Sequence, residues 1–101
     1  MPGLAFSDSE DAFLRYSYYE SSSGRLLVLM SRRGVVDVIL GDEKLQMLLA
    51  AAKRFPATGF VPDRGAHAEW VAAVVTRFEM PGIGVVVPVD LGFGYGLRAA
   101  G

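Results

Sequence analysis

Residues 23–55 read SGRLLVLMSRRGVVDVILGDEKLQMLLAAAKRF, and this stretch decides the fold. It opens with two apolar runs, 25–30 and 35–40, which are joined by Ser31-Arg32-Arg33-Gly34. Runs that are apolar on both alternating faces are typical of central strands covered on both sides. Gly34 accepts the positive φ that a tight reversal usually needs. The two runs therefore predict an antiparallel hairpin.

A third strand is predicted upstream of this hairpin, over residues 13–20. Its side chains alternate in the period-two pattern of a half-buried strand, beginning with Leu14, Arg15 and Tyr16. Residues 21–24, Ser-Ser-Ser-Gly, supply a second tight turn. We therefore expect a three-stranded antiparallel meander, with the strand over 13–20 at an edge of the sheet.

Two helices are predicted after the meander. The first follows Asp42, which can cap a helix, and ends before Pro56, which pushes its preceding residue out of helical dihedrals. Its apolar face is predicted to consist of Leu45, Leu48, Leu49, Ala52 and Phe55. The second helix is predicted over residues 66–79, with an apolar stripe of Trp70, Val71, Val74, Val75 and Phe78.

The remaining segments complete the predicted architecture. Residues 56–63 are rich in proline and glycine, so we expect a surface loop there. Residues 83–91 contain a β-rich run interrupted by Pro88, which cannot donate a ladder hydrogen bond, so we place it at a sheet edge or at a strand end. The predicted fold class is α/β of the α+β type: a three-stranded antiparallel meander followed by two helices and a further edge strand.

Length and composition predict a single domain. The chain has 101 residues, enough for one core. We expect a mobile leader over residues 1–12, the domain over 13–91 and a glycine-rich tail over 92–101. A hydrophobic fraction of 51% and a mean hydropathy of +0.32 are high for so small a protein. We therefore expect an exposed apolar patch or a homo-oligomer.

Neither a membrane span nor a secretory signal is expected. The longest apolar runs, 26–30 and 83–89, are far shorter than the ~20 residues of a membrane helix. Residues 1–11 are acidic rather than basic, unlike a secretory signal. These features predict a cytoplasmic protein with no membrane partner.

A set of short motifs resembles a known family when the motifs are taken in order. They are Ser23-Gly24-Arg25-Leu26-Leu27-Val28, Arg33-Gly34-Val35, Leu40-Gly41-Asp42, Phe55-Pro56 and Val87-Pro88-Val89-Asp90-Leu91-Gly92. Their order and spacing resemble the amino-terminal ribonuclease-like domain of methylated-DNA-protein-cysteine methyltransferases, including the Ada-type regulators. The resemblance covers residues 23–92 and implies a ribonuclease H-like fold.

In that family, the resemblance implies, an alkyl group moves from damaged DNA to a cysteine in a second, carboxy-terminal domain, within a Pro-Cys-His-Arg motif. Alkyl acceptance needs a thiolate, and this sequence has no cysteine. We therefore carry over no catalytic, cofactor-binding or metal residue, and expect no cofactor and no activity of the chain alone. The expected role is a non-catalytic scaffold for DNA repair, with a cysteine-bearing alkyltransferase domain as its partner. The alternative is a stand-alone interaction or ligand-binding module that self-associates.

Charge predicts at most weak or indirect contact with DNA. The formal net charge is −1, whereas proteins that grip a duplex usually carry a basic stripe. The pairs Arg32-Arg33 and Lys53-Arg54 could each touch a phosphate. Pairs of this kind are common on any surface, so we interpret them as solvated charges.

His67 could act as a metal ligand or as a base, and Trp70 could act as a stacking platform for a nucleic-acid base. We do not expect the nearest acidic residues, Asp63 and Glu69, to lie beside His67, so a metal or base site is disfavoured. Trp70 stands on the apolar stripe of the second predicted helix, where an aromatic side chain usually belongs to the core. Both residues are therefore interpreted as structural.

Two further chemistries are considered and disfavoured. Glu20, Asp37 and Asp90 would have to converge to bind a metal for nuclease chemistry, and their spacing gives no reason to expect this. Asp37 is instead expected to face solvent or an arginine. Residues 92–96 are glycine-rich, but a phosphate loop needs a following helix, and only five residues remain after them.

Overall fold

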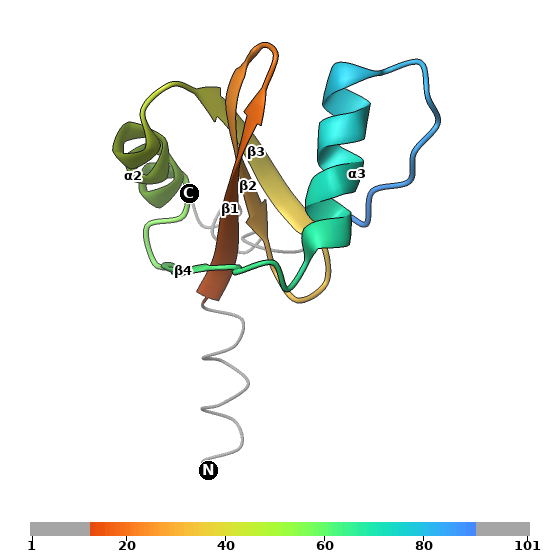
Figure 1. Cartoon of the computed structure of the whole chain (residues 1–101). Helices are drawn as coiled ribbons and strands as arrows, with labels where there is room; N and C mark the ends of the chain where they lie inside the picture. Colours follow the sequence, from red (N-terminus) through yellow and green to blue (C-terminus); the bar gives the residue numbers. More distant parts are fainter. Residues whose placement is uncertain (1–12, 91–101) are drawn as a thin grey trace.

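The computed structural model describes residues 13–90, which form a four-stranded sheet and two helices (Figure 1). In chain order, the elements are β1 (Phe13–Ser21), β2 (Gly24–Met30), β3 (Val35–Gly41), α2 (Lys44–Arg54), β4 (Gly59–Pro62) and α3 (Ala68–Glu79). The predicted α+β class, with its three-stranded meander and two helices, is confirmed. The expected leader over 1–12 and tail over 92–101 lie outside the described residues.

The strand order of the sheet is β3-β2-β1-β4, so β1 is an interior strand. β1 pairs antiparallel with β2 and parallel with β4, from Phe13↔Gly59 to Tyr16↔Pro62. The prediction of β1 at an edge and of a loop over 56–63 was therefore wrong on both points. A four-residue strand that ends at proline carries little local signal, and its pairing depends on a partner more than forty positions away in the sequence.

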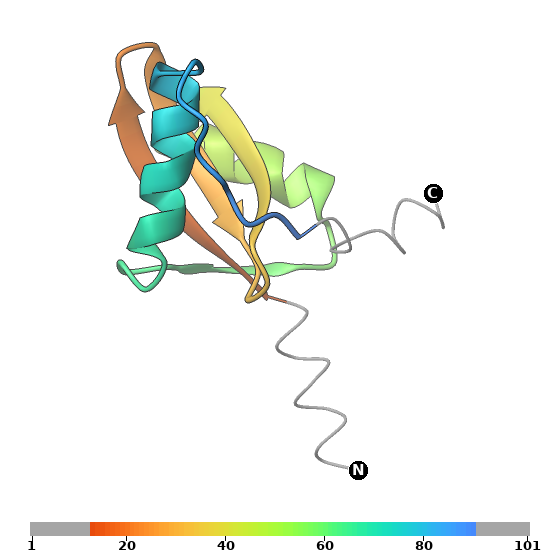
Figure 2. The same cartoon turned by 90° about the vertical axis from the view of Figure 1, so that its right-hand side faces the viewer.

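β2 is an interior strand of the sheet, as the sequence predicted, whereas β3, whose apolar run is also typical of a central strand, is the first strand in the order. Residues 26–30 are fully buried, and the side chains of residues 27–30 alternate between two clusters. Leu27 and Leu29 pack with residues of α2, whereas Val28 and Met30 pack with residues of α3. The two helices accordingly lie on opposite faces of the sheet (Figures 1 and 2). The result is a three-layer arrangement in which each helix covers one face.

α2 buries only part of its predicted face, since Phe55 is buried and Leu48 packs against the core. Met47 and Ala51 are buried, whereas Leu45 and Leu49 are 66% and 54% exposed. The Met47 side chain lies against Gly41, where an added Cβ would stand 2.8 Å from its Cγ. The bare backbone of Gly41 thus admits Met47 and turns the Leu45–Leu49 face outward. Glu43, rather than the predicted Asp42, occupies the N-cap position, without a side-chain cap bond.

α3 matches its predicted stripe more closely, although it begins at Ala68, two residues later than predicted. Val74 and Val75 are buried, and Trp70 packs half-buried against the core on this face. Phe78, at the end of the stripe, is exposed. The structural interpretation of Trp70 is therefore confirmed.

The segment after α3 does not form the continuous edge strand predicted over 83–91. Its one bridge in the described residues is Val35↔Val89, and it is parallel. The Val35 N–H donates to the Pro88 carbonyl at 2.8 Å, and the Asp90 N–H donates to the Val35 carbonyl at 3.0 Å. Pro88 lacks the N–H group that would extend this pairing. The segment therefore reaches the edge of β3, where the prediction placed it, but is held there at a single point (Figure 2).

Candidate functional site

Residues 31–34, here called the arginine turn, connect β2 to β3 and present Arg32 and Arg33 on the surface. The Ser31 N–H donates to the Gly34 carbonyl at 2.8 Å, and the Arg33 N–H donates to Ser31 Oγ at 3.0 Å. The buried Ser31 hydroxyl donates in turn to Asp90 Oδ2 at 2.6 Å. These bonds fix the backbone that carries the two arginines.

Gly34 allows the arginine turn to contact the segment after α3 directly. A Cβ at this position would lie 2.8 Å from the carbonyl carbon and oxygen of Pro88. Such distances are closer than packed carbon atoms tolerate, so only glycine fits. The hydrogen bonds of Val35 and Asp90 follow immediately along the chain. The segment after α3 therefore fixes the arginine turn through contacts that no local sequence pattern reveals.

A surface hollow of about 450 Å³, here called the arginine hollow, lies beside this turn. It is lined by Phe13, Arg15, Met30, Arg32 and Val61, and none of these described residues is acidic. Arg15 lies between Met30 on β2 and Val61 on β4 in the sheet register. Sequence reasoning considered Arg32 but missed Arg15, because the strand register brings them together. The alternation of β1 combined with the hairpin register was the signal that could have found it.

Asp63 and His67 form a second polar cluster, at the start of α3. The Asp63 side chain is buried and accepts the His67 N–H at 2.7 Å, and His67 Nδ1 lies 2.6 Å from Asp63 Oδ1. The imidazole stacks on Trp70 with 4.3 Å between ring centroids. The expectation that no acidic residue lies beside His67 was wrong. Asp63 stands four residues earlier, and the turn between them brings its carboxylate next to the imidazole. These contacts anchor the first turn of α3.

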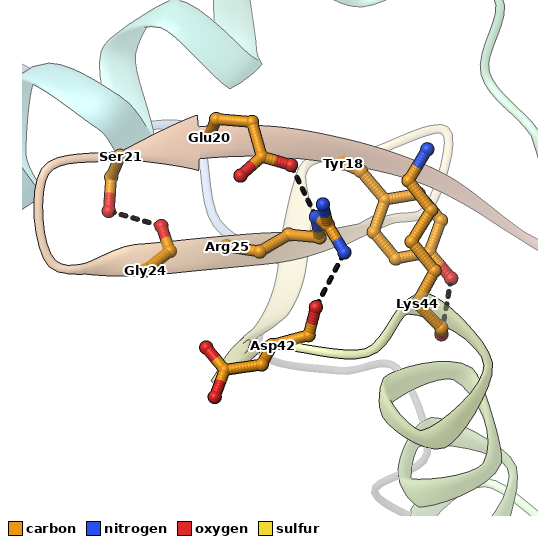
Figure 3. Close-up of polar contacts among 7 residues, drawn as sticks. All are labelled: Tyr18, Glu20, Ser21, Gly24, Arg25, Asp42 and Lys44. Carbon is orange, nitrogen blue, oxygen red and sulfur yellow. Dashed lines mark hydrogen bonds and ion pairs between the residues drawn. The ribbon is translucent and has the colours of Figure 1, made fainter.

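Arg25 joins the β1–β2 hairpin to the start of α2 (Figure 3). Its Nε pairs with Glu20 across the hairpin, and its Nη1 donates to the Asp42 carbonyl at 2.5 Å. The hairpin turn is closed by the Ser21 hydroxyl, which donates to the Gly24 carbonyl at 2.6 Å. The guanidinium therefore links three elements, and Glu20 is committed to this link.

Tyr18 forms the second half of the same junction (Figure 3). Its hydroxyl donates to the Lys44 carbonyl at 2.7 Å, and the Lys44 ammonium stands 5.3 Å from its ring centroid. Burial raises the pKa of the Tyr18 hydroxyl, nearby Tyr16 adds to the rise, and Arg25 opposes it. A phenol that stays protonated keeps donating to the helix backbone, so this junction is structural.

The acidic residues weighed for metal binding are held apart by different partners. Asp37 pairs with Arg54, which confirms the expectation of an arginine partner, and Asp90 accepts from Ser31. Glu20 pairs with Arg25. Within residues 13–90, no group of three or more histidine, cysteine, aspartate or glutamate residues is placed to hold a metal ion. Arg54, one of the two cations at the end of α2, is thereby committed to Asp37.

An apolar groove of about 660 Å³ runs between α3, β3 and the segment after α3. Its lining residues are Val35, Val38, Val74, Arg77, Phe78, Val85, Val86, Val87 and Val89. The side chain of Val86 is 87% exposed, and Phe78 and Val89 are also exposed. Arg77 Nη1 donates to the Val85 carbonyl at 3.3 Å, which ties α3 to the segment. The exposed apolar patch expected from composition is therefore present in this groove.

Comparison with known proteins gives a distant relationship. No model of a known protein family matches the chain. The chain is similar to the bifunctional transcriptional activator/DNA repair enzyme Ada of Escherichia coli (strain K12), with 26% identity over 82 residues. The match covers 81% of this chain and 23% of Ada, so the chain spans less than a quarter of that protein's length. In the described residues, neither helix is long and apolar enough to cross a membrane.

Proposed function

We propose that this chain is a non-catalytic scaffold domain of DNA-alkylation repair, and that the cysteine that accepts the alkyl group belongs to a separate domain or polypeptide. The similarity to Ada, a DNA repair enzyme, over 82 residues carries this proposal. The sequence contains no cysteine, so no thiolate of this chain can accept an alkyl group. The scaffold assignment reconciles the relationship with the missing nucleophile.

The polar contacts of the structure support a scaffold role. Arg25 and Tyr18 hold the hairpin to α2, Asp63 holds the start of α3, and Asp90 holds the arginine turn. The first three bonds are made to backbone atoms, and the fourth holds the Ser31 hydroxyl that accepts the Arg33 N–H. A rigid body of this kind is what a supporting domain must supply, because a reactive centre has to be held within fractions of an ångström.

The apolar groove is the surface that we assign to the cysteine-bearing domain. Ada extends well beyond the 23% of its length that matches this chain, so the relative possesses residues that could cover such a surface. Val86, Phe78 and Val89 offer exposed apolar area that a partner would remove from water. Covering the groove would also add contacts to the segment after α3, whose one bridge to β3 within residues 13–90 is Val35↔Val89.

A binding experiment tests this assignment. The chain would be titrated into a cysteine-bearing carboxy-terminal alkyltransferase domain, and association measured by isothermal calorimetry. We expect binding that Val86→Lys weakens at least tenfold, because a desolvated cation would enter the interface. Leu45→Lys is the matched control, since Leu45 is also an exposed apolar residue, on α2, but lies outside the groove. Absence of binding, or equal loss in both variants, would refute the assignment.

A second candidate function is a stand-alone module that self-associates, and the same exposed groove favours it. Two copies could cover each other's Val86 and Phe78 without any repair partner. Sedimentation equilibrium separates the candidates. A dimer that Val86→Lys converts to a monomer, combined with no binding to the alkyltransferase domain, would favour the module over the scaffold.

A further inference from the structure

The side of α2 that faces away from the sheet, here called the outer face of α2, is a second exposed apolar surface. It lies on the opposite side of the sheet from α3 and the apolar groove (Figures 1 and 2). Its leucines, Leu45 and Leu49, stand one helical turn apart and are each more than half exposed. Residues 47–52 are all apolar, so α2 carries apolar side chains toward the sheet and toward solvent. A helix of this kind is usually covered on both sides.

The two ends of α2 carry opposite charges beside this face. Asp42 and Glu43 precede the helix, and Lys53 stands in its last turn. The Asp42 carboxylate points away from the junction with the β1–β2 hairpin (Figure 3). Within residues 13–90, neither these two carboxylates nor the Lys53 ammonium has an ion-pair partner, whereas Arg54 is already paired with Asp37. One acidic end and one cation at the other end are therefore available to a second molecule.

We propose that the outer face of α2 binds the same face of a second copy of this chain, with the two helices antiparallel. If Leu45 of one copy packs against Leu49 of the other, the twofold axis repeats this contact. Four residues further along each helix, in opposite directions, Lys53 of one copy is level with residue 41 of the other and stands beside Asp42. The interface then contains two leucine contacts and two ion pairs.

The arrangement of charge favours a second copy over a different partner. Each feature of the outer face finds its complement on the same face when the helices run in opposite directions. A parallel pair would instead place Lys53 against Lys53 and Asp42 against Asp42. The antiparallel pair also sets the positive amino-terminal end of each helix dipole beside the negative carboxy-terminal end of the other. The outer face of α2 is therefore self-complementary in both apolar contacts and charge.

The size of the interface predicts a weak dimer. α2 has 11 residues, so the contact is about 16 Å long. A single helix pair of this length is too short to bury the ~800 Å² per partner of a standard interface. We therefore expect a dissociation constant on the order of 100 μM. The chain is then a monomer at the low micromolar concentrations of a denaturation experiment.

This inference goes beyond the scaffold function, since a scaffold needs no second copy of itself. In the dimer the apolar groove stays open, because the groove and the outer face of α2 lie on opposite sides of the sheet (Figures 1 and 2). The two proposals also fail separately. A dimer can form without any alkyltransferase domain, and a monomer can still bind that domain in its groove.

Sedimentation equilibrium tests the proposal on the full chain, from tenfold below to tenfold above the expected dissociation constant. We expect the average mass to rise from that of one chain toward that of two. Leu45→Lys should weaken association at least tenfold, because it places a cation in the apolar contact. Met80→Lys is the matched control and should leave association nearly unchanged, since Met80 is an exposed apolar residue at the end of α3. Circular dichroism verifies that each variant is folded.

Charge reversal tests the antiparallel pairing. Lys53→Glu and Asp42→Lys should each weaken self-association several-fold, because like charges then meet at both ends of the interface. A mixture of these two variants should associate more tightly than either variant alone, since both ion pairs form again in the mixed dimer with their signs restored or exchanged. A mixture that associates no better than its components would overturn the proposal.

The remaining outcomes assign the surface to another occupant or to none. No rise in mass, or equal effects of Leu45→Lys and Met80→Lys, would overturn the proposal. A dimer that Val86→Lys abolishes and Leu45→Lys leaves intact would belong to the apolar groove instead. Binding of the alkyltransferase domain that Leu45→Lys weakens would assign the outer face of α2 to that domain and would likewise overturn it.

Discussion

The Ser31 hydroxyl donates a 2.6 Å hydrogen bond to the Asp90 carboxylate across 59 positions of sequence. Both residues are buried away from water, so their polar side chains need hydrogen-bond partners within the protein, and this bond supplies one to each. It closes the arginine turn against the segment after α3. The bond therefore joins the arginine turn to the segment that forms one wall of the apolar groove.

Replacing Ser31 by alanine should lower the free energy of unfolding by about 1.5–3 kcal/mol, because a buried carboxylate oxygen loses a donor. Urea denaturation measures the change. Ser23→Ala is the matched control, since Ser23 lies exposed in the β1–β2 turn. Equal stability of the two variants would show that the Ser31–Asp90 bond contributes nothing.

Replacing Gly34 by alanine should destabilise the fold by about 1–3 kcal/mol through overpacking against the Pro88 backbone. Thermal denaturation checks this prediction, with Gly82→Ala as control, because a Cβ at Gly82 meets nothing within 4 Å. If Gly34→Ala melts together with Gly82→Ala, the close approach to Pro88 does not hold in solution.

The burial pattern of α2 leads to opposite predictions for two of its apolar residues, Met47 and Leu49. Met47→Ala should cost about 2–5 kcal/mol because it empties core space. Leu49→Ala should change stability by only about 0.5 kcal/mol or less, because Leu49 already faces solvent. Chemical denaturation of both variants decides the matter. The reverse order of destabilisation would restore the helix face predicted from sequence.

The raised pKa of Tyr18 leads us to expect a loss of stability at alkaline pH. Its pKa is raised in the folded protein above the ordinary value of 10.0, chiefly by burial. The unfolded chain therefore loses this proton first, so the stabilisation is complete below pH 10 and declines as pH rises from 10 through the folded pKa. Urea midpoints measured across this range should fall less steeply for Tyr18→Phe than for the parent chain. Tyr19→Phe, at an exposed position, should retain the parent slope.

Local sequence patterns were sufficient for the elements whose signals are local. The apolar runs on either side of the arginine turn predicted β2 and β3, and the 3.6-residue spacing predicted the buried Val74 and Val75 of α3. Hydrophobic periodicity predicts these features because the apolar pattern of each strand or helix face lies entirely within the residues of that element.

Most of the errors share a physical cause, which is dependence on a partner outside the element itself. β4 exists because β1 offers it an edge, and the buried face of α2 depends on the fit of Met47 over Gly41. The arginine hollow depends on the register between strands. The Ser31–Asp90 bond depends on the segment after α3 coming back to the arginine turn. The Asp63–His67 pair is the exception, since its spacing of four residues was visible in the sequence and was misjudged.

The central claim is that this chain supports alkyl transfer without receiving the alkyl group. The direct measurement incubates the chain with a cysteine-bearing alkyltransferase domain and DNA that carries an isotopically labelled methyl lesion, followed by mass spectrometry of both polypeptides. We predict that the chain accelerates labelling of the partner's cysteine and itself gains no label. A methyl adduct on this chain, or a labelling rate unaffected by its presence, would contradict it.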